Sequence, residues 1–290
     1  MNDRFEFGTY SLDLETLECS FNYISVHNGV KRTFVEKLIL PYKPSRLNIP
    51  QELLDRVLKY LHLTIGVSYF KIFVQDTVVV PYVLSTEEAA FFTILYKKGL
   101  GEFYYRNNLS LKKAPIFPSD ESIKREPFTL ESSTDNILVG LGGGKDSIVA
   151  LELLKEQGFA PSVFIVGGEQ ETALHKSLVE KTKSPAYQVK RILDQQLFSP
   201  IQDSYNGHVP VSAIYSLVGY LLALLYHFSY VVVGNEHSSN FGNILFESTE
   251  INHQWSKSIE YEHLFQDLCR SSLSPNIVYF SLLRPFYEIR

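Results

Sequence analysis

Cysteine, methionine and tryptophan are scarce in this 290-residue sequence, which has two, one and one of them respectively. Cys19 and Cys269 lie far apart and match no metal-ligand spacing, so we expect two free thiols and no disulfide framework. Runs of basic residues are absent as well, and the formal net charge is −5. This charge argues against a protein whose main task is to grip the backbone of a nucleic acid.

Long, uninterrupted apolar runs are also lacking. The most apolar stretch, 209–233, is broken by serines, tyrosines and a histidine, and we expect a buried helix that leads into a buried strand. The first residues lack the charged segment followed by an apolar segment that is typical of a signal peptide. The composition, 45% hydrophobic and 20% charged, is that of a globular protein. We therefore expect a cytoplasmic protein with no membrane partner.

The sequence pattern changes near residue 135, and we predict two domains, 1–134 and 135–290. The first is expected to be a smaller α+β domain with an antiparallel meander, and it ends in a linker rich in Pro, Ser and Glu. Its predicted strands span 5–12, 17–25 and 33–41, with a turn at 27–29, and a strand pair is predicted near 66–84. Its predicted helices span 50–63 and 86–100.

Apolar runs and helical patterns alternate after residue 135. The predicted strands span 137–141, 162–167, 186–193 and 230–234. The predicted helices span 146–157, 169–182 and 211–227. Such alternation with short connections indicates an α/β fold, in which a parallel sheet carries helices on both faces. Ligands of such sheets bind outside the carboxyl ends of the strands.

The most informative segment is 142–147, Gly-Gly-Gly-Lys-Asp-Ser, which joins a predicted strand to a helix. Bare backbone N–H groups at a helix N-terminus bind phosphate groups. A Walker A loop is excluded, because Val139 and Asp146 stand where it needs Gly and Ser or Thr. A Rossmann fingerprint is excluded, because Lys145 stands where it needs a third glycine. The segment resembles the Ser-Gly-Gly-x-Asp-Ser loop of the PP-loop ATP pyrophosphatases, with Gly142 in place of the first serine.

The residue types of this glycine loop favour ATP bound with Mg²⁺. Gly143 and Gly144 let the backbone close on a pyrophosphate, because neither carries a Cβ. Ser147 can donate its hydroxyl to a phosphate oxygen. Asp146 would repel a polyphosphate unless a metal ion lay between them, so we predict that it is a Mg²⁺ ligand. The alternative is a glycine-rich turn capped by Asp146, without a ligand.

Two other predicted strands end at the same edge of the sheet. One of them ends at Gly167 and Gly168, where an adenosine could pack, and a polar segment that reaches residue 243 follows the other. That segment could also be an ordinary surface loop. The predicted cofactor-binding residues are Gly142, Gly143, Gly144, Lys145, Asp146, Ser147, Gly167, Gly168 and Asn235. Three histidines in polar loops are further candidates for ligand contacts: His208, His237 and His253.

Several blocks resemble one family when they are taken together and in order. The blocks are Lys98 with Gly-Leu-Gly-Glu-Phe-Tyr-Tyr-Arg-Asn (99–107), the glycine loop (142–147), Asn-Gly-His-Val-Pro (206–210), Gly-Asn-Glu (234–236) with Asn-Phe-Gly-Asn (240–243), Asn-His-Gln-Trp-Ser-Lys-Ser (252–258) and Tyr-Phe-Ser-Leu-Leu-Arg-Pro (279–285). They resemble the bacterial UDP-N-acetylmuramoyl-L-alanyl-L-glutamate epimerases, PP-loop-type proteins of peptidoglycan precursor synthesis. Many ATP pyrophosphatases share the glycine loop, whereas the ordered blocks are much more specific.

The resemblance implies an ATP- and Mg²⁺-dependent inversion of the terminal L-Glu of UDP-MurNAc-L-Ala-L-Glu to D-Glu, with release of AMP and pyrophosphate. Adenylation removes the negative charge of the carboxylate, so that a side-chain base of ordinary strength can take the α-proton. Glu236, His253 or Lys257 is expected to supply this base. Members of the family continue beyond the last block with a cysteine-containing segment, so a chain that ends at Arg290 is expected to be a shortened form.

Two other functions stay open. Another PP-loop enzyme could adenylate a different acceptor, as the amide synthetases and the tRNA thiolases do. A thiolase would be expected to show catalytic or metal-binding cysteines and a charge suited to tRNA, and this sequence has neither. Alternatively, the chain could be a nucleotide-binding module without turnover.

Overall fold

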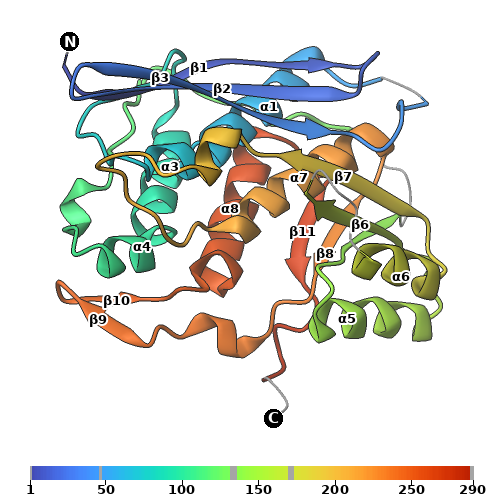
Figure 1. The fold of residues 1–290 in the computed structure, drawn as a ribbon. Coiled ribbons are helices and arrows are strands. Elements are labelled where there is room, and N and C mark those ends of the chain that lie inside the picture. Colours follow the sequence, from blue (N-terminus) through green and yellow to red (C-terminus); the bar gives the residue numbers. More distant parts are fainter. Residues whose placement is uncertain (1, 46–47, 131–135, 169–172, 288–290) are drawn as a thin grey trace.

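The structure is a computed structural model that describes residues 2–45, 48–130, 136–168 and 173–287. The strands are β1 (Arg4–Asp13), β2 (Glu18–His27), β3 (Val30–Ile39), β4 (Val78–Val79), β5 (Ile137–Gly140), β6 (Ser162–Gly167), β7 (Ala186–Ile192), β8 (Tyr230–Val233), β9 (Ile244–Phe246), β10 (Thr249–Ile251) and β11 (Val278–Ser281). The α-helices are α1 (Gln51–Ile65), α2 (Val67–Phe70), α3 (Thr86–Lys98), α4 (Gly101–Arg106), α5 (Lys145–Glu156), α6 (Ala173–Thr182), α7 (Val211–Tyr226) and α8 (Ile259–Ser272). Within the described ranges, nine strands form one mixed sheet in the order β11-β8-β5-β6-β7-β3-β2-β1-β4 (Figure 1).

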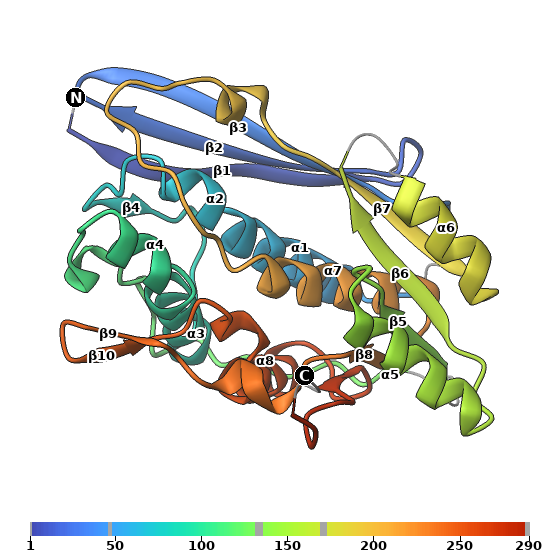
Figure 2. The same cartoon turned by 60° about the horizontal axis from the view of Figure 1, so that its bottom comes forward.

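Strands β1, β2 and β3 form the antiparallel meander that the sequence predicts. Asn28 and Gly29 make the two-residue turn between β2 and β3, and both have a positive φ (51° and 74°), as a type I′ turn requires. Buried and partly exposed residues alternate along β2, because successive side chains of a strand point to opposite faces. The buried face of the meander packs on α1, and α7 lies beside α1 against β5 and β8. Helices α3 and α8 lie on the other side of α1 and α7 (Figure 2).

The parallel half of the sheet comprises β11, β8, β5, β6 and β7. Ile137 and Val139 of β5 pack in a cluster with residues of α5 and α6. Leu138, between them, belongs to the larger core that contains α7 and α8. Strands of this kind are apolar on both faces because helices cover both. The predicted α/β class and the helices on both faces are therefore confirmed.

Strand β3 pairs in antiparallel fashion with β7, which makes the meander and the parallel strands one continuous sheet. A buried ion pair accompanies this junction: Arg191 Nε of β7 lies 2.6 Å from Glu36 Oε1 of β3. The predicted domain boundary, between residues 134 and 135, lies outside the described residues, so the division into two domains stays a prediction. Among the described residues, none of the helices combines the length and the apolar character that a membrane crossing needs.

The prediction of a strand pair near 66–84 is wrong. The chain continues from α1 through Gly66 into the short helix α2, and only the two residues of β4 are extended in this region. Val67, Tyr69 and Phe70 favour strands by propensity, but here they are buried in the core as helical residues. Packing therefore overrides the β-propensity of this apolar segment. The hairpin of β9 and β10, the short helix α4 and the edge strand β11 are additions that the sequence did not predict.

Candidate active site

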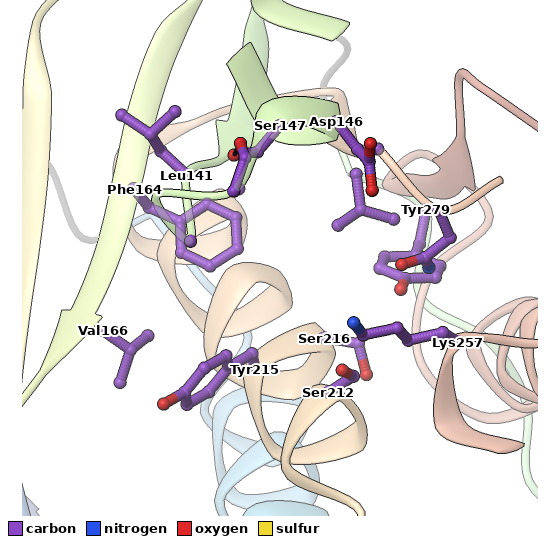
Figure 3. Close-up of a pocket in the computed structure, with 16 residues that line it drawn as sticks. Leu141, Asp146, Ser147, Phe164, Val166, Ser212, Tyr215, Ser216, Lys257 and Tyr279 are labelled. Atoms are coloured by element: carbon purple, nitrogen blue, oxygen red, sulfur yellow. Dashed lines mark hydrogen bonds between the residues drawn. The ribbon is translucent and has the colours of Figure 1, made fainter. Parts of the chain in front are cut away.

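A cavity of about 480 Å³ lies at the carboxyl ends of β5, β6 and β8 (Figure 3). The glycine loop and the start of α5 form one side of it, and the first turns of α7 form the opposite side. Phe164 and Val166 of β6 and Tyr279 of β11 contribute apolar and aromatic walls. This position is the one in which α/β sheets bind ligands, because the loops that leave neighbouring parallel strands diverge there.

The glycine loop leaves open space on the wall of the cavity. β5 ends at Gly140 and α5 begins at Lys145, and both Gly142 and Gly144 line the cavity. A Cβ added to Gly142 or Gly144 would meet no atom within 4 Å, whereas Gly143 has a φ of +81°, which L side chains rarely adopt. The loop is thus an open cradle at a helix N-terminus, where the helix dipole and free N–H groups favour an anion.

Asp146 and Ser147, in the first turn of α5, complete this side of the cavity. Ser147 Oγ donates a hydrogen bond to the carbonyl oxygen of Gly144 at 2.9 Å, which holds the hydroxyl beside the cradle. The exit of β8 approaches the same turn closely, since a Cβ on Gly234 would lie 2.5 Å from the carbonyl oxygen of Asp146. A glycine at position 234 therefore lets two loops of the site pack against each other.

The opposite side of the cavity is polar, although α7 is a largely apolar helix. Ser212, Tyr215 and Ser216 line the cavity from α7, and Lys257 lines it from the segment before α8. Figure 3 shows the Lys257 side chain reaching into the space between the glycine loop and α7. These three α7 residues were not among the predicted site residues. Their spacing of three and four in an otherwise apolar helix is a signal that could have indicated them, because residues at this spacing share one face.

The predicted site residues differ in their relation to this cavity. Six of them line it: Gly142, Gly144, Asp146, Ser147, Asn235 and Lys257. The residues that line the cavity do not include the other six predicted site residues: Gly143, Lys145, Gly167, Gly168, Glu236 and His253. Of the three residues that were expected to supply a base, Lys257 is thus the one that borders the cavity.

Arg284 connects three of the sequence blocks at the rim of the site. Its Nη1 donates to the carbonyl oxygen of Glu236 at 3.1 Å and to Ser239 Oγ at 3.1 Å. Its Nη2 donates to the carbonyl oxygen of Lys257 at 2.9 Å and to Glu262 Oε2 at 2.6 Å. One guanidinium therefore fixes both the exit of β8 and the backbone that carries Lys257.

A second polar pair joins α4 to the loop before α7, and neither of its residues is among those that line the cavity. His208 Nδ1 lies 3.8 Å from Glu102 Oε2 of α4. Burial lowers the pKa of His208, and the carboxylate of Glu102 raises it. The blocks 98–107 and 206–210 thus meet here, and Asn107 Nδ2 also donates a hydrogen bond to the carbonyl oxygen of Asn206 at 3.0 Å.

The described residues fit a bound Mg²⁺ only if the nucleotide supplies most of its ligands. Among them, no group of three or more His, Cys, Asp or Glu side chains is placed to hold a metal ion. Asp146 is the carboxylate that lines the cavity. Mg²⁺ in nucleotide sites commonly uses one or two carboxylates together with phosphate oxygens and water, and Asp146 suits that pattern.

Cys19 and Cys269 are both buried free thiols, as the sequence predicts.

Comparison with known proteins identifies one family. The family model described as the MurL N-terminal domain matches residues 1–282. A relative from Salinispora tropica, named UDP-N-acetyl-alpha-D-muramoyl-L-alanyl-L-glutamate epimerase, is 35% identical over 99% of this chain and 63% of its own length. Relatives of the same name from Xanthomonas oryzae pv. oryzae and a Micromonospora species are also 35% identical, and the matches cover 62% and 64% of their lengths. The chain thus spans a little under two thirds of the length of these curated relatives.

A solved structure, described as a predicted subunit of tRNA methyltransferase from Methanocaldococcus jannaschii, matches 52% of this chain and 71% of its own chain, with 16% identity and a TM-score of 0.32. It adds nothing to the assignment of the family. The family-model match extends over nearly the whole sequence and agrees with the resemblance of the ordered blocks. The chain belongs to the MurL N-terminal domain family.

Proposed function

We propose that this chain epimerises the terminal L-Glu of UDP-MurNAc-L-Ala-L-Glu to D-Glu in an ATP-dependent reaction that releases AMP and pyrophosphate. The observation that carries the proposal is that the open glycine cradle and the Lys257 side chain border the same cavity. The cavity volume of about 480 Å³ is within the range of small-molecule sites. The names of the relatives support the choice of substrate and reaction.

Each part of the glycine loop has a separate task in this proposal. Gly142 and Gly144 give the pyrophosphate of ATP room at the N-terminus of α5. The Ser147 hydroxyl would turn from the carbonyl oxygen of Gly144, to which it donates in this structure, and donate to a phosphate oxygen instead. Asp146 would hold Mg²⁺, which supplies positive charge against the phosphates when bound. The aromatic and apolar residues Phe164 and Val166 offer a surface on which the adenine can pack.

Activation of the glutamate carboxylate makes the inversion chemically possible. The α-proton of a free carboxylate is very weakly acidic, because the resulting carbanion would stand beside a full negative charge. Transfer of AMP to the carboxylate removes that charge and provides an electron sink, and a side-chain base then suffices. We propose Lys257 as one of the groups that exchange a proton with the α-carbon, because it borders the cavity, whereas Glu236 and His253 do not line it.

Release of AMP in the presence of the muramoyl dipeptide, ATP and Mg²⁺ tests this function. Alanine at Asp146 or at Ser147 is expected to lower the rate by about a hundredfold, because each removes a group that holds the nucleotide phosphates. Asp267→Ala is the matched control, since Asp267 is an exposed residue of α8 that pairs with Arg270. AMP release at the wild-type rate by both loop variants would contradict the proposal. ATP binding without AMP release in the wild-type chain would indicate a nucleotide-binding module instead.

A further inference from the structure

A second cavity, of about 380 Å³, lies between the end of α3, strand β10 and the start of α8. Among the described residues, none lines both this cavity and the first one. In Figure 1 and Figure 2 the hairpin of β9 and β10 lies on the side of α8 that is away from α5. The volume is within the range of small-molecule sites. The second cavity is thus a separate candidate site, to which the binding of ATP at the glycine loop assigns no role.

The lining of the second cavity combines buried apolar residues with exposed charges. Three apolar side chains that line it are buried: Leu111, Ile251 and Trp255. Four charged residues that line it are exposed: Lys97, Lys98, Glu250 and Glu260. Such a lining suits a ligand that has an aromatic ring at one end and ionised groups at the other.

Two consecutive lysines at the end of α3 supply positive charge. Within the described part of the chain, the Lys97 ammonium group has neither an ion-pair nor a hydrogen-bond partner. Lys98 Nζ pairs with Glu260 Oε1, and because the two side chains are 42% and 45% exposed, this pair adds little stability. Trp255 Nε1 donates to Glu260 Oε2 at 2.8 Å, so the carboxylate keeps a partner when Lys98 turns to a ligand. Both ammonium groups can therefore bind the phosphates of a ligand.

Two uncharged polar groups of the lining can bind a ring. Asn240 Oδ1 accepts hydrogen bonds from the backbone N–H of Ile259 at 2.7 Å and from Arg284 Nη1 at 3.3 Å, which fixes the orientation of the amide. Its Nδ2 has no acceptor among the described residues, and the Thr249 hydroxyl has no hydrogen-bond partner among them either. An amide N–H and a hydroxyl suit the carbonyl and N–H groups of a uracil ring.

A 3₁₀ turn, Trp255–Lys257, lies between the two cavities. Lys257 lines the first cavity and Trp255 lines the second. Because the two residues are two positions apart, their Cα atoms are at most about 7 Å from each other. In the substrate of the proposed function, an alanine, a lactyl group and a sugar ring join the glutamate to the diphosphate and span up to about 15 Å. A glutamate beside Lys257 thus leaves the nucleotide end within reach of the second cavity.

We propose that the second cavity binds the uridine diphosphate end of the substrate, with the uracil ring against the buried apolar residues and the diphosphate beside Lys97 and Lys98. This inference rests on the proposed function for the identity of the nucleotide. The first cavity then holds ATP and the glutamate, and the turn that carries Lys257 separates the two ends of one substrate.

Trp255, the one tryptophan of the sequence, reports on the second cavity because it lines it. UDP is titrated into the wild-type chain without ATP, and binding is followed by tryptophan fluorescence and by calorimetry. We expect saturable binding that changes the fluorescence. Lys97→Ala should weaken UDP binding about tenfold or more and leave the affinity for ATP–Mg²⁺ unchanged, because it removes a cation from the phosphates. Lys112→Ala, an exposed lysine that lines neither cavity, is the matched control and should change neither affinity.

Gly144→Ala gives the reverse comparison, because Gly144 lines the first cavity. It should weaken the binding of ATP–Mg²⁺ and leave the affinity for UDP unchanged. A loss of UDP affinity equal to that of ATP would place UDP in the first cavity and overturn the proposal. No binding of UDP to the wild-type chain, or wild-type affinity for UDP in folded Lys97→Ala, would overturn it as well. Displacement of UDP by inorganic pyrophosphate at equal concentration would overturn the placement of the ring.

Release of AMP distinguishes a failure of this site from a failure of the proposed function. Lys97→Ala should raise the KM for UDP-MurNAc-L-Ala-L-Glu about tenfold and leave that for MurNAc-L-Ala-L-Glu, which lacks UDP, unchanged. If the wild-type chain releases no AMP with either substrate, the proposed function fails, and the UDP titrations still decide the site. If it releases AMP and Lys97→Ala changes neither KM, the function stands and the second cavity is not its nucleotide site.

Discussion

Substitution of single glycines in the loop can test ligand binding separately from folding. Gly144 lines the cavity, has a φ of −80° that alanine readily adopts, and would place a Cβ in open space. Gly143, in contrast, has a φ of +81°, at which any L side chain is strained. Neighbouring positions of one loop are therefore glycine for two different reasons: room for a ligand and backbone conformation.

Gly144→Ala is expected to fold with unchanged stability and to bind ATP–Mg²⁺ about tenfold or more weakly, because the added methyl group occupies the phosphate cradle. Gly143→Ala is expected to lose about 1 kcal/mol or more of stability, because its backbone conformation is strained. Isothermal titration with ATP–Mg²⁺ and thermal unfolding of both variants measure the two effects. Wild-type affinity in Gly144→Ala would show that the phosphates do not lie at this glycine.

At the level of secondary-structure elements, the site depends on side-chain hydrogen bonds between the segments that follow or precede them. The exit of β8, the segment before α8 and the end of β11 all meet at Arg284. Glu262 of α8 is almost completely buried and accepts hydrogen bonds from Arg284 and from the backbone N–H of Ser281. Loss of the arginine leaves this carboxylate buried without its charged partner, which is costly.

Arg284→Met is expected to lower the free energy of unfolding by about 3 kcal/mol or more, and a second change, Glu262→Gln, should recover part of this loss because no buried charge remains. Urea unfolding of the two single variants and the double variant gives the coupling between them. Arg270→Met is the control: it breaks an exposed pair with Asp267 and should cost less than about 1 kcal/mol. Additive effects of the two changes would contradict a coupled pair.

The local sequence pattern was sufficient to predict those elements whose residues have the same structural preference locally and in the packed core. The meander, the alternating strands and helices after residue 135 and the glycine loop at the start of α5 follow from the sequence. The segment that contains α2 could not be predicted this way, because its β-branched and aromatic residues are helical only through contacts with distant parts of the core. The polar face of α7 can be recognised from the spacing of Ser212, Tyr215 and Ser216, but that it faces the glycine loop follows only from the tertiary structure.

At the scale of the whole molecule, the continuous sheet joins the two predicted domains. The pairing of β3 with β7 and the buried pair of Glu36 with Arg191 link residues from both of them. One hydrophobic core also contains Cys19 of β2 and Trp255, which precedes α8. The described parts of the chain are thus expected to lose their structure together.

Chemical unfolding tests this expectation with two probes that belong to the two predicted domains. Trp255 is the one tryptophan of the sequence, and in the Cys269→Ser variant Cys19 is the one thiol. The loss of Trp255 burial, followed by fluorescence, and the exposure of the Cys19 thiol to a reagent should have the same midpoint. Separate midpoints would show two units that unfold independently.

In the proposed function, this chain inverts a glutamate centre after its carboxylate has been activated with ATP. The most direct measurement is the joint determination of D-Glu and AMP formed from UDP-MurNAc-L-Ala-L-Glu, with and without ATP. We expect D-Glu to appear only when ATP is present, with at least one AMP released for each D-Glu formed. Formation of D-Glu without ATP, or consumption of ATP that leaves the glutamate entirely in the L form, would contradict this function.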